Sequence, residues 1–469
     1  MSTWLPGTQA LGGRPTDCRE SGRPGGQARR HASYDRPVIF RQRDRKDTHE
    51  VFGVSNEVLP DSYVDRGDLD ERIRRLLDRP THIALRGVSK CGKSWLRQTV
   101  LPDAIVIQCR LGKGVTDLYR EALGELGVRL EVSSTKDSSL TGKVEASADV
   151  GVKLIAKVTG RAAVERTSGG TTTYEPISED INDLRLVAQL ILASGRRLVI
   201  EDFHYLSIEE RRTFAFDLKA LWDFGVFVVI VGVWSEQNML LYLNPDLTGR
   251  VQEIPVVWNR DDLRRIFEKG GEALNIDFSE VVVGRAIADC YENAGILQSL
   301  ILGTLDHLGI DYTTDSTITV DDVDALEHAE LTYADQLNPL YQEFAKRVAR
   351  GIRVRQNATG IYAHAMAVVL SASDNDLIRG FPLDRIFDTA HAREARIQKG
   401  NLRTVLERIE SLQVDEGGRG LVLAYNASSG DVTIVDRQLL LYRKYSTIKW
   451  PWEDLIAEAE TQGELFDTA

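Results

Sequence analysis

The segment that decides the fold is His82-Ile-Ala-Leu-Arg86-Gly87-Val-Ser-Lys-Cys-Gly-Lys93-Ser94-Trp95-Leu-Arg-Gln98. It begins as a short apolar strand, continues as a match to the pattern G-x-x-x-x-G-K-[ST], and ends in residues typical of a helix. Glycines let the backbone curl so that successive N–H groups and the helix N-terminus face a phosphate. The lysine then neutralises phosphate oxygens and the hydroxyl ligates Mg²⁺. The sequence therefore predicts a phosphate-binding loop between a strand and a helix.

A second acidic site is needed to hold the Mg²⁺ shell and to orient the attacking water. Leu198-Val-Ile-Glu201-Asp202 provides it, because a short apolar strand ends in two carboxylates. One carboxylate is expected to face the metal and the other to face the terminal phosphate. The alternative is an acidic strand end that caps the following turn.

Strands and helices alternate along the first half of the chain. Strands are predicted at 82–86, 104–108, 198–200, 226–231 and 251–256, with helical segments between most of them. This alternation is typical of an α/β fold with a mainly parallel sheet covered on both faces. A Ser/Thr/Gly-rich insertion at 132–178 interrupts it, and apolar residues occupy every second position from Val144 to Val158. The alternation favours a β-hairpin or a long strand used in self-association, and a mobile surface loop is the alternative.

Composition sets limits on the class of protein. The 469 residues hold 58 Lys and Arg against 70 Asp and Glu, a net charge of −12, which argues against a protein that coats nucleic acid over its whole surface. The four cysteines, Cys18, Cys91, Cys109 and Cys290, are scattered, so neither a disulfide framework nor a zinc site is predicted. The longest apolar run has nine residues, which is less than half of the roughly 20 that a helix needs to span a bilayer. We expect a cytoplasmic protein that does not interact with a membrane.

The charge is unevenly distributed. Residues 1–50 hold 10 Lys and Arg against 6 Asp and Glu, and their Gly/Pro/Arg-rich runs predict a disordered basic tail. Residues 343–408 hold 12 Lys and Arg against 7 Asp and Glu. Three helices followed by a hairpin around the turn Ser428–Asp431 are typical of a winged helix, in which Arg396, Lys399 and Arg403 share one helix face. Such a module would contact a DNA major groove or would pack on the rest of the chain and relay its state.

Two motifs, Gly87 to Ser94 and Val199-Ile-Glu-Asp-Phe-His204, resemble those of AAA+ and STAND P-loop ATPases, most of all the Orc1/Cdc6-like and TniB/ExeA-like members. The resemblance covers roughly residues 60–310. It implies a P-loop ATPase core at 51–258, a helical lid at 259–333, a winged-helix-like domain at 334–446 and a C-terminal tail at 447–469.

The resemblance also implies residue roles. The expected phosphate contacts are Gly87, Val88, Ser89, Lys90, Cys91, Gly92, Lys93, Ser94 and Trp95. Matched by position, Glu201 joins Ser94 as a metal ligand and Asp202 positions the water. The family usually has Asp and then Glu here, so the reversed side-chain lengths suggest slow turnover. A register in which Asp202 is the metal acid stays open.

Further family positions are less well matched. Ser235, Gln237 and Asn238 are candidate sensors of the terminal phosphate, and Arg250 is a candidate arginine finger acting on a neighbouring subunit, or else a surface arginine that pairs with Asp246 or Glu253. Gln298 stands where a lid arginine is expected, and Tyr63–Arg66 lies where the family contacts adenine.

These expectations describe a protein that binds ATP and Mg²⁺. We expect a slow hydrolysing switch whose nucleotide state controls self-assembly into a homo-oligomer or engagement of a protein partner. The alternatives are an ATP-dependent DNA-binding loader or transposition regulator that uses residues 343–408, and a non-hydrolysing nucleotide-gated scaffold in a mobile-element or phage-defence system.

Overall fold

The protein is described from a computed structural model. It describes residues 45–133, 141–146, 151, 153–154, 166–168, 171–173, 177–178, 184–234, 237–350, 360–413 and 421–457. The predicted tail at 1–44, most of the insertion and the residues after 457 lie outside this description. The described residues from Arg45 onward belong to one compact unit.

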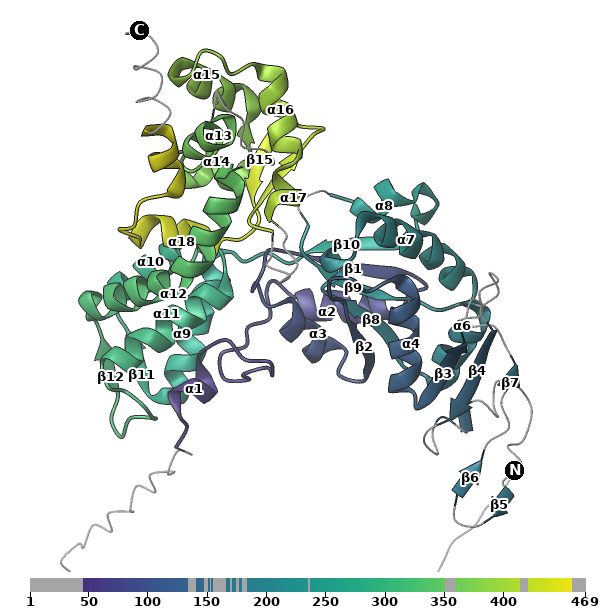
Figure 1. Cartoon of the computed structure of the whole chain (residues 1–469). Coiled ribbons are helices and arrows are strands. Elements are labelled where there is room, and N and C mark those ends of the chain that lie inside the picture. Colours follow the sequence, from purple (N-terminus) through teal and green to yellow (C-terminus); the bar gives the residue numbers. More distant parts are fainter. Residues whose placement is uncertain are drawn as a thin grey trace, which may run out of the picture. The chain divides into compact units, whose positions relative to one another are not determined.

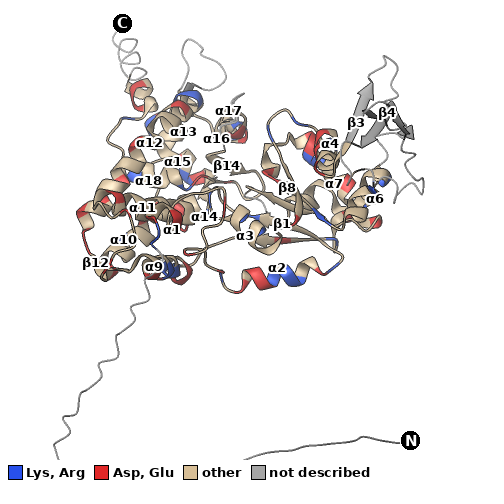
Figure 2. Cartoon of the chain, turned by 90° about the horizontal axis from the view of Figure 1, so that it is seen from below, with Lys and Arg blue, Asp and Glu red and all other residues tan. Residues whose placement is uncertain are grey.

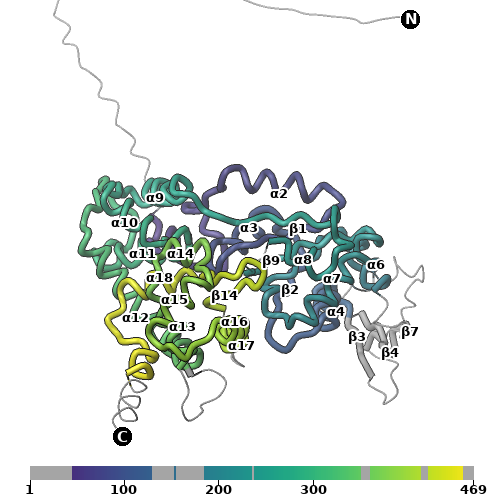
Figure 3. The backbone as a smooth tube through the Cα atoms, turned by 90° about the horizontal axis from the view of Figure 1, so that it is seen from above, coloured from purple at the N-terminus to yellow at the C-terminus, as the bar shows by residue number. Residues whose placement is uncertain are grey.

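A five-stranded parallel sheet lies at the centre of the N-terminal half (Figure 1). Its strand order is β10-β1-β9-β8-β2, and the ladders that join these strands are all parallel. The strands are β1 (His82–Arg86), β2 (Ala104–Gln108), β8 (Arg197–Glu201), β9 (Val229–Gly232) and β10 (Val251–Pro255). The predicted α/β class with a parallel sheet is therefore confirmed. Figure 3 shows that β1 and β9, distant in sequence, lie side by side.

The predicted strand at 226–231 is wrong at its start. β9 begins only at Val229, although Val226 and Val228 are buried. The Val228 N–H donates to Nδ1 of His82 at 2.9 Å instead of continuing the ladder, while the Val228 carbonyl accepts from Ile83. The apolar run therefore marks buried residues, and these include residues just before the strand as well as those in it.

Helices cover both faces of the sheet because strand side chains alternate between them. In β1, Ile83 and Leu85 join one hydrophobic cluster, and Ala84 joins the other. The first cluster contains the apolar residues of α2 (Leu69–Leu77) and α3 (Lys93–Val100), and the second contains those of α4, α6, α7 and α8. The bounds of these helices are α4 (Val115–Glu125), α6 (Leu184–Ser194), α7 (Ile208–Asp223) and α8 (Met239–Leu243). Short turns η1 (Phe203–Tyr205) and η2 (Pro245–Leu247) follow β8 and α8.

The insertion contains antiparallel strands in its described parts. β3 (Val128–Ser133) pairs with β4 (Thr141–Ala146), which also pairs with β7 (Ile177–Ser178), and β5 (Arg166–Ser168) pairs with β6 (Thr171–Thr173). β4 thus lies in a hairpin. A single strand from Val144 to Val158 is wrong, because Gly151, Lys153 and Leu154 are helical. At these three residues the alternation of apolar side chains does not correspond to a strand.

Helices follow the sheet, as the sequence predicts. They are α9 (Arg260–Leu274), α10 (Glu280–Asp289), α11 (Ala294–His307) and α12 (Val323–Arg350), with a small parallel pair β11 (Ile276–Phe278) and β12 (Ile318–Val320) and the short α1 (Thr48–Val51) before the sheet. α12 is continuous through residue 333, where the boundary between the lid and the winged-helix-like domain is predicted.

The C-terminal part contains helices and a small three-stranded sheet of order β13-β15-β14. β14 and β15 form the predicted hairpin, with Leu423 opposite Ile434. The elements are α13 (Ile361–Val369), α14 (Asp374–Arg379), β13 (Phe381–Pro382), α15 (Leu383–Arg393), α16 (Lys399–Glu407), α17 (Ile409–Gln413), β14 (Leu423–Asn426), β15 (Asp431–Ile434) and α18 (Gln438–Tyr445). Helices α15 to α17 lie in the chain between the short β13 and the β14–β15 hairpin, an order typical of winged-helix-like modules.

Charged residues lie on helix surfaces with both signs interspersed (Figure 2). On α2, Asp70 and Glu71 occupy the first turn and Arg74 and Arg75 the last, which complements the helix dipole. None of the helices among the described residues is long and apolar enough to cross a membrane.

Candidate functional site

The predicted loop, Gly87–Ser94, connects the end of β1 to the start of α3. Its residues 89–94, followed by Trp95, line a cavity of about 250 Å³, whereas Gly87 and Val88 do not line it. Gly87 has no room for a side chain, since a Cβ there would lie 2.6 Å from Cys91 Sγ and 2.8 Å from the Val256 carbonyl. Gly92 has φ +83°, a conformation that glycine adopts without strain, and it precedes the first turn of α3. The loop conformation therefore requires glycine at both positions.

Lys93 concentrates positive charge in the loop. Its Nζ donates to the carbonyls of Val88 at 2.7 Å and Gly87 at 3.1 Å, and it lies 3.8 Å from Cys91 Sγ. The side chain is buried. A buried ammonium within a turn of backbone, beside the amino end of a helix, favours an anionic ligand.

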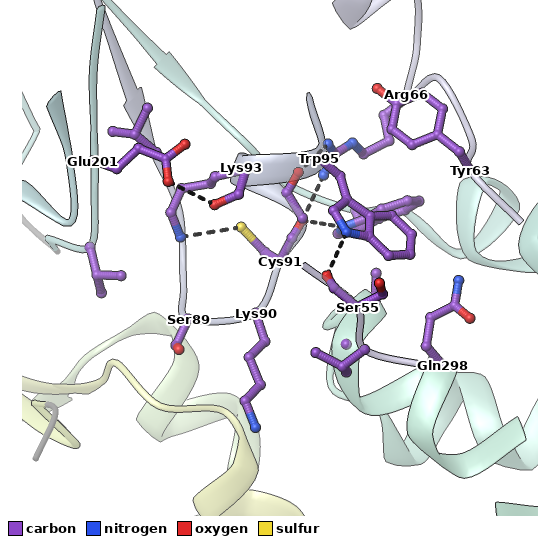
Figure 4. Close-up of a pocket in the computed structure, with 18 of the residues that line it drawn as sticks. Ser55, Tyr63, Arg66, Ser89, Lys90, Cys91, Lys93, Trp95, Glu201 and Gln298 are labelled. Carbon is purple, nitrogen blue, oxygen red and sulfur yellow. Dashed lines mark hydrogen bonds between the residues drawn. The ribbon is translucent and has the colours of Figure 1, made fainter. Parts of the chain in front are cut away.

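The first predicted acid, Glu201, ends β8 and faces the start of α3 (Figure 4). Its Oε2 accepts a hydrogen bond from Ser94 Oγ at 3.5 Å, so the two predicted metal ligands lie side by side. Its Oε1 accepts a 2.8 Å hydrogen bond from Nε of Arg97, one helical turn after Lys93. Arg97 is not among the predicted site residues, although its position four residues after the loop lysine on the same helix was a signal.

The second predicted acid, Asp202, follows β8 and lines the cavity. Its backbone has φ +55°, in the left-handed region that Asp tolerates better than most residues. Its Oδ2 accepts a 2.9 Å hydrogen bond from Nε2 of Gln108, the last residue of β2. Gln108 is not among the predicted site residues either. Its position at the end of a strand was a signal, because neighbouring parallel strands bring their carboxyl ends to the same edge of the sheet.

His204 belongs to the acidic-strand motif and also lines the cavity. Burial lowers its pKa to about 4, so the ring is neutral at pH 7. Its Nδ1 accepts the backbone N–H of Val233 at 3.4 Å, which leaves the ring proton on Nε2.

The opposite wall of the cavity comes from the segment predicted to contact adenine. Arg66 is buried and donates to the carbonyls of Cys91 at 2.7 Å and Gly92 at 3.3 Å, and its guanidinium lies 4.4 Å from the ring centre of Trp258. Burial lowers the pKa of Arg66.

Tyr63 lines the same wall, and Trp95 Nε1 donates to the Ser55 carbonyl at 2.9 Å. Figure 4 shows these side chains grouped on one side of the loop.

Gln298 is buried where the resemblance implies a cation. Its Oε1 accepts from the Gly53 N–H at 3.1 Å, and its Nε2 donates to Ser62 Oγ at 3.0 Å. The amide therefore holds the segment that precedes the sheet against α11.

The lid and the C-terminal part also contact the loop. Asn293, which caps α11, donates through Nδ2 to the Ser89 carbonyl at 2.8 Å, and the Gly295 N–H donates to the Lys90 carbonyl at 3.0 Å. Lys90 has φ +58°, and its Nζ donates to Oε1 of Gln438 on α18 at 2.8 Å.

Three further predicted residues, Gln237, Asn238 and Arg250, do not line the cavity. Ser235 lies outside the described residues, and Gln237 and Asn238 are exposed and do not line the cavity. Arg250 precedes β10 and so lies at the amino ends of the parallel strands, whereas the loop lies at their carboxyl ends. Its Nη1 donates to the Asp246 carbonyl at 2.5 Å, and its guanidinium lies 4.9 Å from the Trp222 ring centre. Glu253 pairs instead with Arg86 at 2.9 Å.

The basic segment at 343–408 is partly neutralised within the chain. Arg396 pairs with Glu394 at 2.7 Å, just before α16, and Lys399 pairs with Asp384 at 2.7 Å. The Arg396 guanidinium lowers the pKa of Glu394 to about 2. Residues 351–359 of this segment lie outside the described residues.

A scan against protein-family models gave no match, and no curated protein matches the sequence. Solved structures with a similar fold include Orc1 of Aeropyrum pernix in complex with DNA, at 11% identity and a TM-score of 0.36, over 90% of this chain and 98% of that one. A STAND protein with a tetratricopeptide repeat sensor from Pyrococcus horikoshii is 9% identical at a TM-score of 0.34, over 90% of this chain and 47% of that one. The RuvB Holliday junction branch migration motor of Thermotoga maritima is 11% identical at 0.33, over 82% and 96%.

Two of these structures, Orc1 and the STAND protein, are of the classes that the two sequence motifs resemble. The identities and TM-scores are too low to carry a function to this chain. The fold assignment rests on the parallel sheet and on the loop between β1 and α3.

Proposed function

We propose that this chain is an ATP-binding P-loop protein of the AAA+/STAND type, which acts as a slow Mg·ATP-hydrolysing switch. The observation that carries the proposal is the junction of the Gly87–Ser94 loop, the buried Lys93 and the acidic end of β8 around one cavity. Its fit to ATP is supported by the loop glycines, which allow the tight turn of the backbone before α3, and by the cavity wall that continues past the loop to Tyr63 and Trp258.

Each residue would have a separate task in this cavity. The loop N–H groups and the start of α3 would bind the β-phosphate, and Lys93 would leave its backbone acceptors for the β/γ oxygens. Ser94 and Glu201 would hold Mg²⁺, which supplies charge neutralisation between the β- and γ-phosphates. Asp202 would orient a water molecule for attack on the γ-phosphorus and accept its proton as the β–γ bridging bond breaks.

The experiment that tests binding is isothermal titration of ATP and ADP into the full chain and into Lys93→Ala. We expect binding to be lost in Lys93→Ala and kept in Lys219→Ala, a matched control whose lysine pairs with Asp223 on the surface of α7. Unchanged affinity in Lys93→Ala would sink the phosphate-site assignment. Asp202→Asn should keep ATP bound and slow phosphate release.

Nucleotide-controlled assembly is the second part of the proposal. Light scattering after size exclusion with ATP, ADP or neither tests whether the oligomeric state follows the nucleotide. If Arg250 acts on a neighbouring subunit, Arg250→Ala should slow hydrolysis only under conditions in which the chain assembles. Identical elution in all three nucleotide conditions would remove self-assembly from the proposal.

A non-hydrolysing nucleotide-gated scaffold is the second candidate function. It is favoured by the hydrogen bonds that occupy both acids, from Arg97 to Glu201 and from Gln108 to Asp202. Single-turnover assays with radiolabelled ATP distinguish the two, since a scaffold releases no phosphate while it retains bound ATP. DNA engagement is not proposed, because Arg396 and Lys399 are each paired with an acid.

A further inference from the structure

Arg97 and Glu201 form an ion pair at the border of the candidate nucleotide site, where Glu201 lines the cavity and Arg97 lies behind it on α3. Arg97 lies on α3, one turn after Lys93, and its Nε donates to Glu201 Oε1 at 2.8 Å. Both side chains are only 12% exposed. A charge pair this enclosed is held in place, because separating it would leave an uncompensated charge away from water.

The pair changes what Glu201 can offer a metal ion. The carboxylate in a Mg²⁺ site compensates part of the ion's charge through its oxygens or their bound waters. Here the guanidinium already compensates that charge, and the free oxygen, Oε2, faces Ser94 Oγ at 3.5 Å. A divalent cation between Ser94 and Glu201 would therefore gain less attraction from Glu201 than from a carboxylate without a cationic partner.

The phosphates, in contrast, do not need the metal for attraction. Lys93 and the start of α3 supply positive charge at the loop. Because Arg97 neutralises Glu201, that carboxylate adds no net negative charge that would repel the phosphates.

We propose that Arg97 takes the place of Mg²⁺ as the counter-charge of Glu201, so that this chain binds free ATP or ADP about as well as their magnesium complexes. The inference rests on the proposed nucleotide site and names the form of the ligand that the site accepts. It also accounts for slow turnover, because a weakly held metal ion neutralises the developing charge less well.

The test is isothermal titration of ATP into the full chain in EDTA and in excess Mg²⁺. For the wild type we expect the two dissociation constants to agree within about threefold. Arg97→Met keeps the aliphatic stem but removes the charge, so Glu201 becomes free to join a metal shell. In that variant we expect binding to be about tenfold or more tighter with Mg²⁺ than in EDTA, and Arg97→Lys should restore the wild-type ratio.

Arg86→Met is the matched control. It breaks a similar partly buried pair, Arg86 to Glu253 at 2.9 Å, which lies on β1 and β10 and does not touch Glu201. Its ratio of dissociation constants should stay at the wild-type value.

Each outcome bears on one claim. No ATP binding in either buffer would defeat the proposed function itself. Binding that weakens about tenfold or more in EDTA for the wild type, with the same ratio in Arg97→Met, would overturn the role of Arg97. If Arg97→Met does not fold, the wild-type ratio decides alone, because metal-dependent binding contradicts the proposal and metal-independent binding supports it.

Discussion

At the scale of single residues, Gly87 is the position with least freedom in the loop. A methyl group there would meet Cys91 Sγ at 2.6 Å and the Val256 carbonyl at 2.8 Å, and the second contact is with backbone that cannot turn away. Gly87→Ala should therefore lower the free energy of unfolding by about 1–3 kcal/mol and weaken ATP binding. Gly124→Ala is the control, because nothing lies within 4 Å of its added Cβ and α4 should gain about 1 kcal/mol. Urea unfolding of both variants checks the prediction, and equal effects of the same sign would contradict it.

Gln108 restrains the acid that we propose to orient water. Its Nε2 donates to Asp202 Oδ2 at 2.9 Å, so one carboxylate oxygen is occupied by an amide in place of water. In Gln108→Leu this oxygen is released, and we expect phosphate release from ATP to become several-fold faster while ATP affinity changes little. The exposed Gln237→Leu serves as the control. A slower reaction in Gln108→Leu would indicate that Gln108 positions Asp202 productively.

At the scale of elements, His82 joins β1 to two neighbours. Its Nδ1 accepts from Val228 before β9, and its Nε2 lies 2.9 Å from the Leu218 carbonyl of α7, so the neutral ring with its proton on Nε2 satisfies both. Burial lowers the pKa of His82 to about 4. The unfolded value is about 6.5, so below that pH the unfolded chain binds a proton that the folded chain does not.

Stability should therefore decrease as the pH falls from about 6.5 towards 4. Between pH 7 and pH 5 the loss from His82 is about 2 kcal/mol. Urea unfolding at both pH values measures it, and His82→Gln, whose amide can donate and accept in the same place, should lose this part of the pH dependence. His204 adds a change of the same sign, since burial lowers its pKa to about 4 as well. An unchanged pH profile in His82→Gln would contradict the assignment.

The elements that the sequence predicts best are those with a local signal. The strands at 82–86 and 104–108 match β1 and β2 residue for residue, because short apolar runs are bounded by loop signals on both sides. The early start assigned to β9 was wrong, because apolar residues can be buried without pairing. Gln108 was missed for another reason: its contact with Asp202 depends on which strands are neighbours, and β2 pairs with β8 only in the folded sheet. The partner of Arg97 likewise depends on the approach of α3 to the end of β8, which is set by the fold.

At the scale of the whole described unit, the phosphate loop is tied to α18 of the C-terminal part. Lys90 donates to Gln438 at 2.8 Å, and the same Oε1 accepts from the Tyr333 hydroxyl at 2.6 Å, so α12, α18 and the loop share one acceptor. Asn293 holds the neighbouring loop residue, Ser89, from α11. Phosphate binding that shifts Ser89 and Lys90 must therefore disturb these partners.

Hydrogen exchange measures this coupling directly. In the wild type, ATP should change the exchange rates of amides in α18, Gln438–Tyr445, whereas amides in α6, on the other side of the sheet, should respond less. Gln438→Ala removes the shared acceptor, so its α18 response should fall while ATP affinity changes by less than about threefold. A full response of α18 in Gln438→Ala would show that coupling passes through Asn293 and α11, since these contacts on the loop remain intact in that variant.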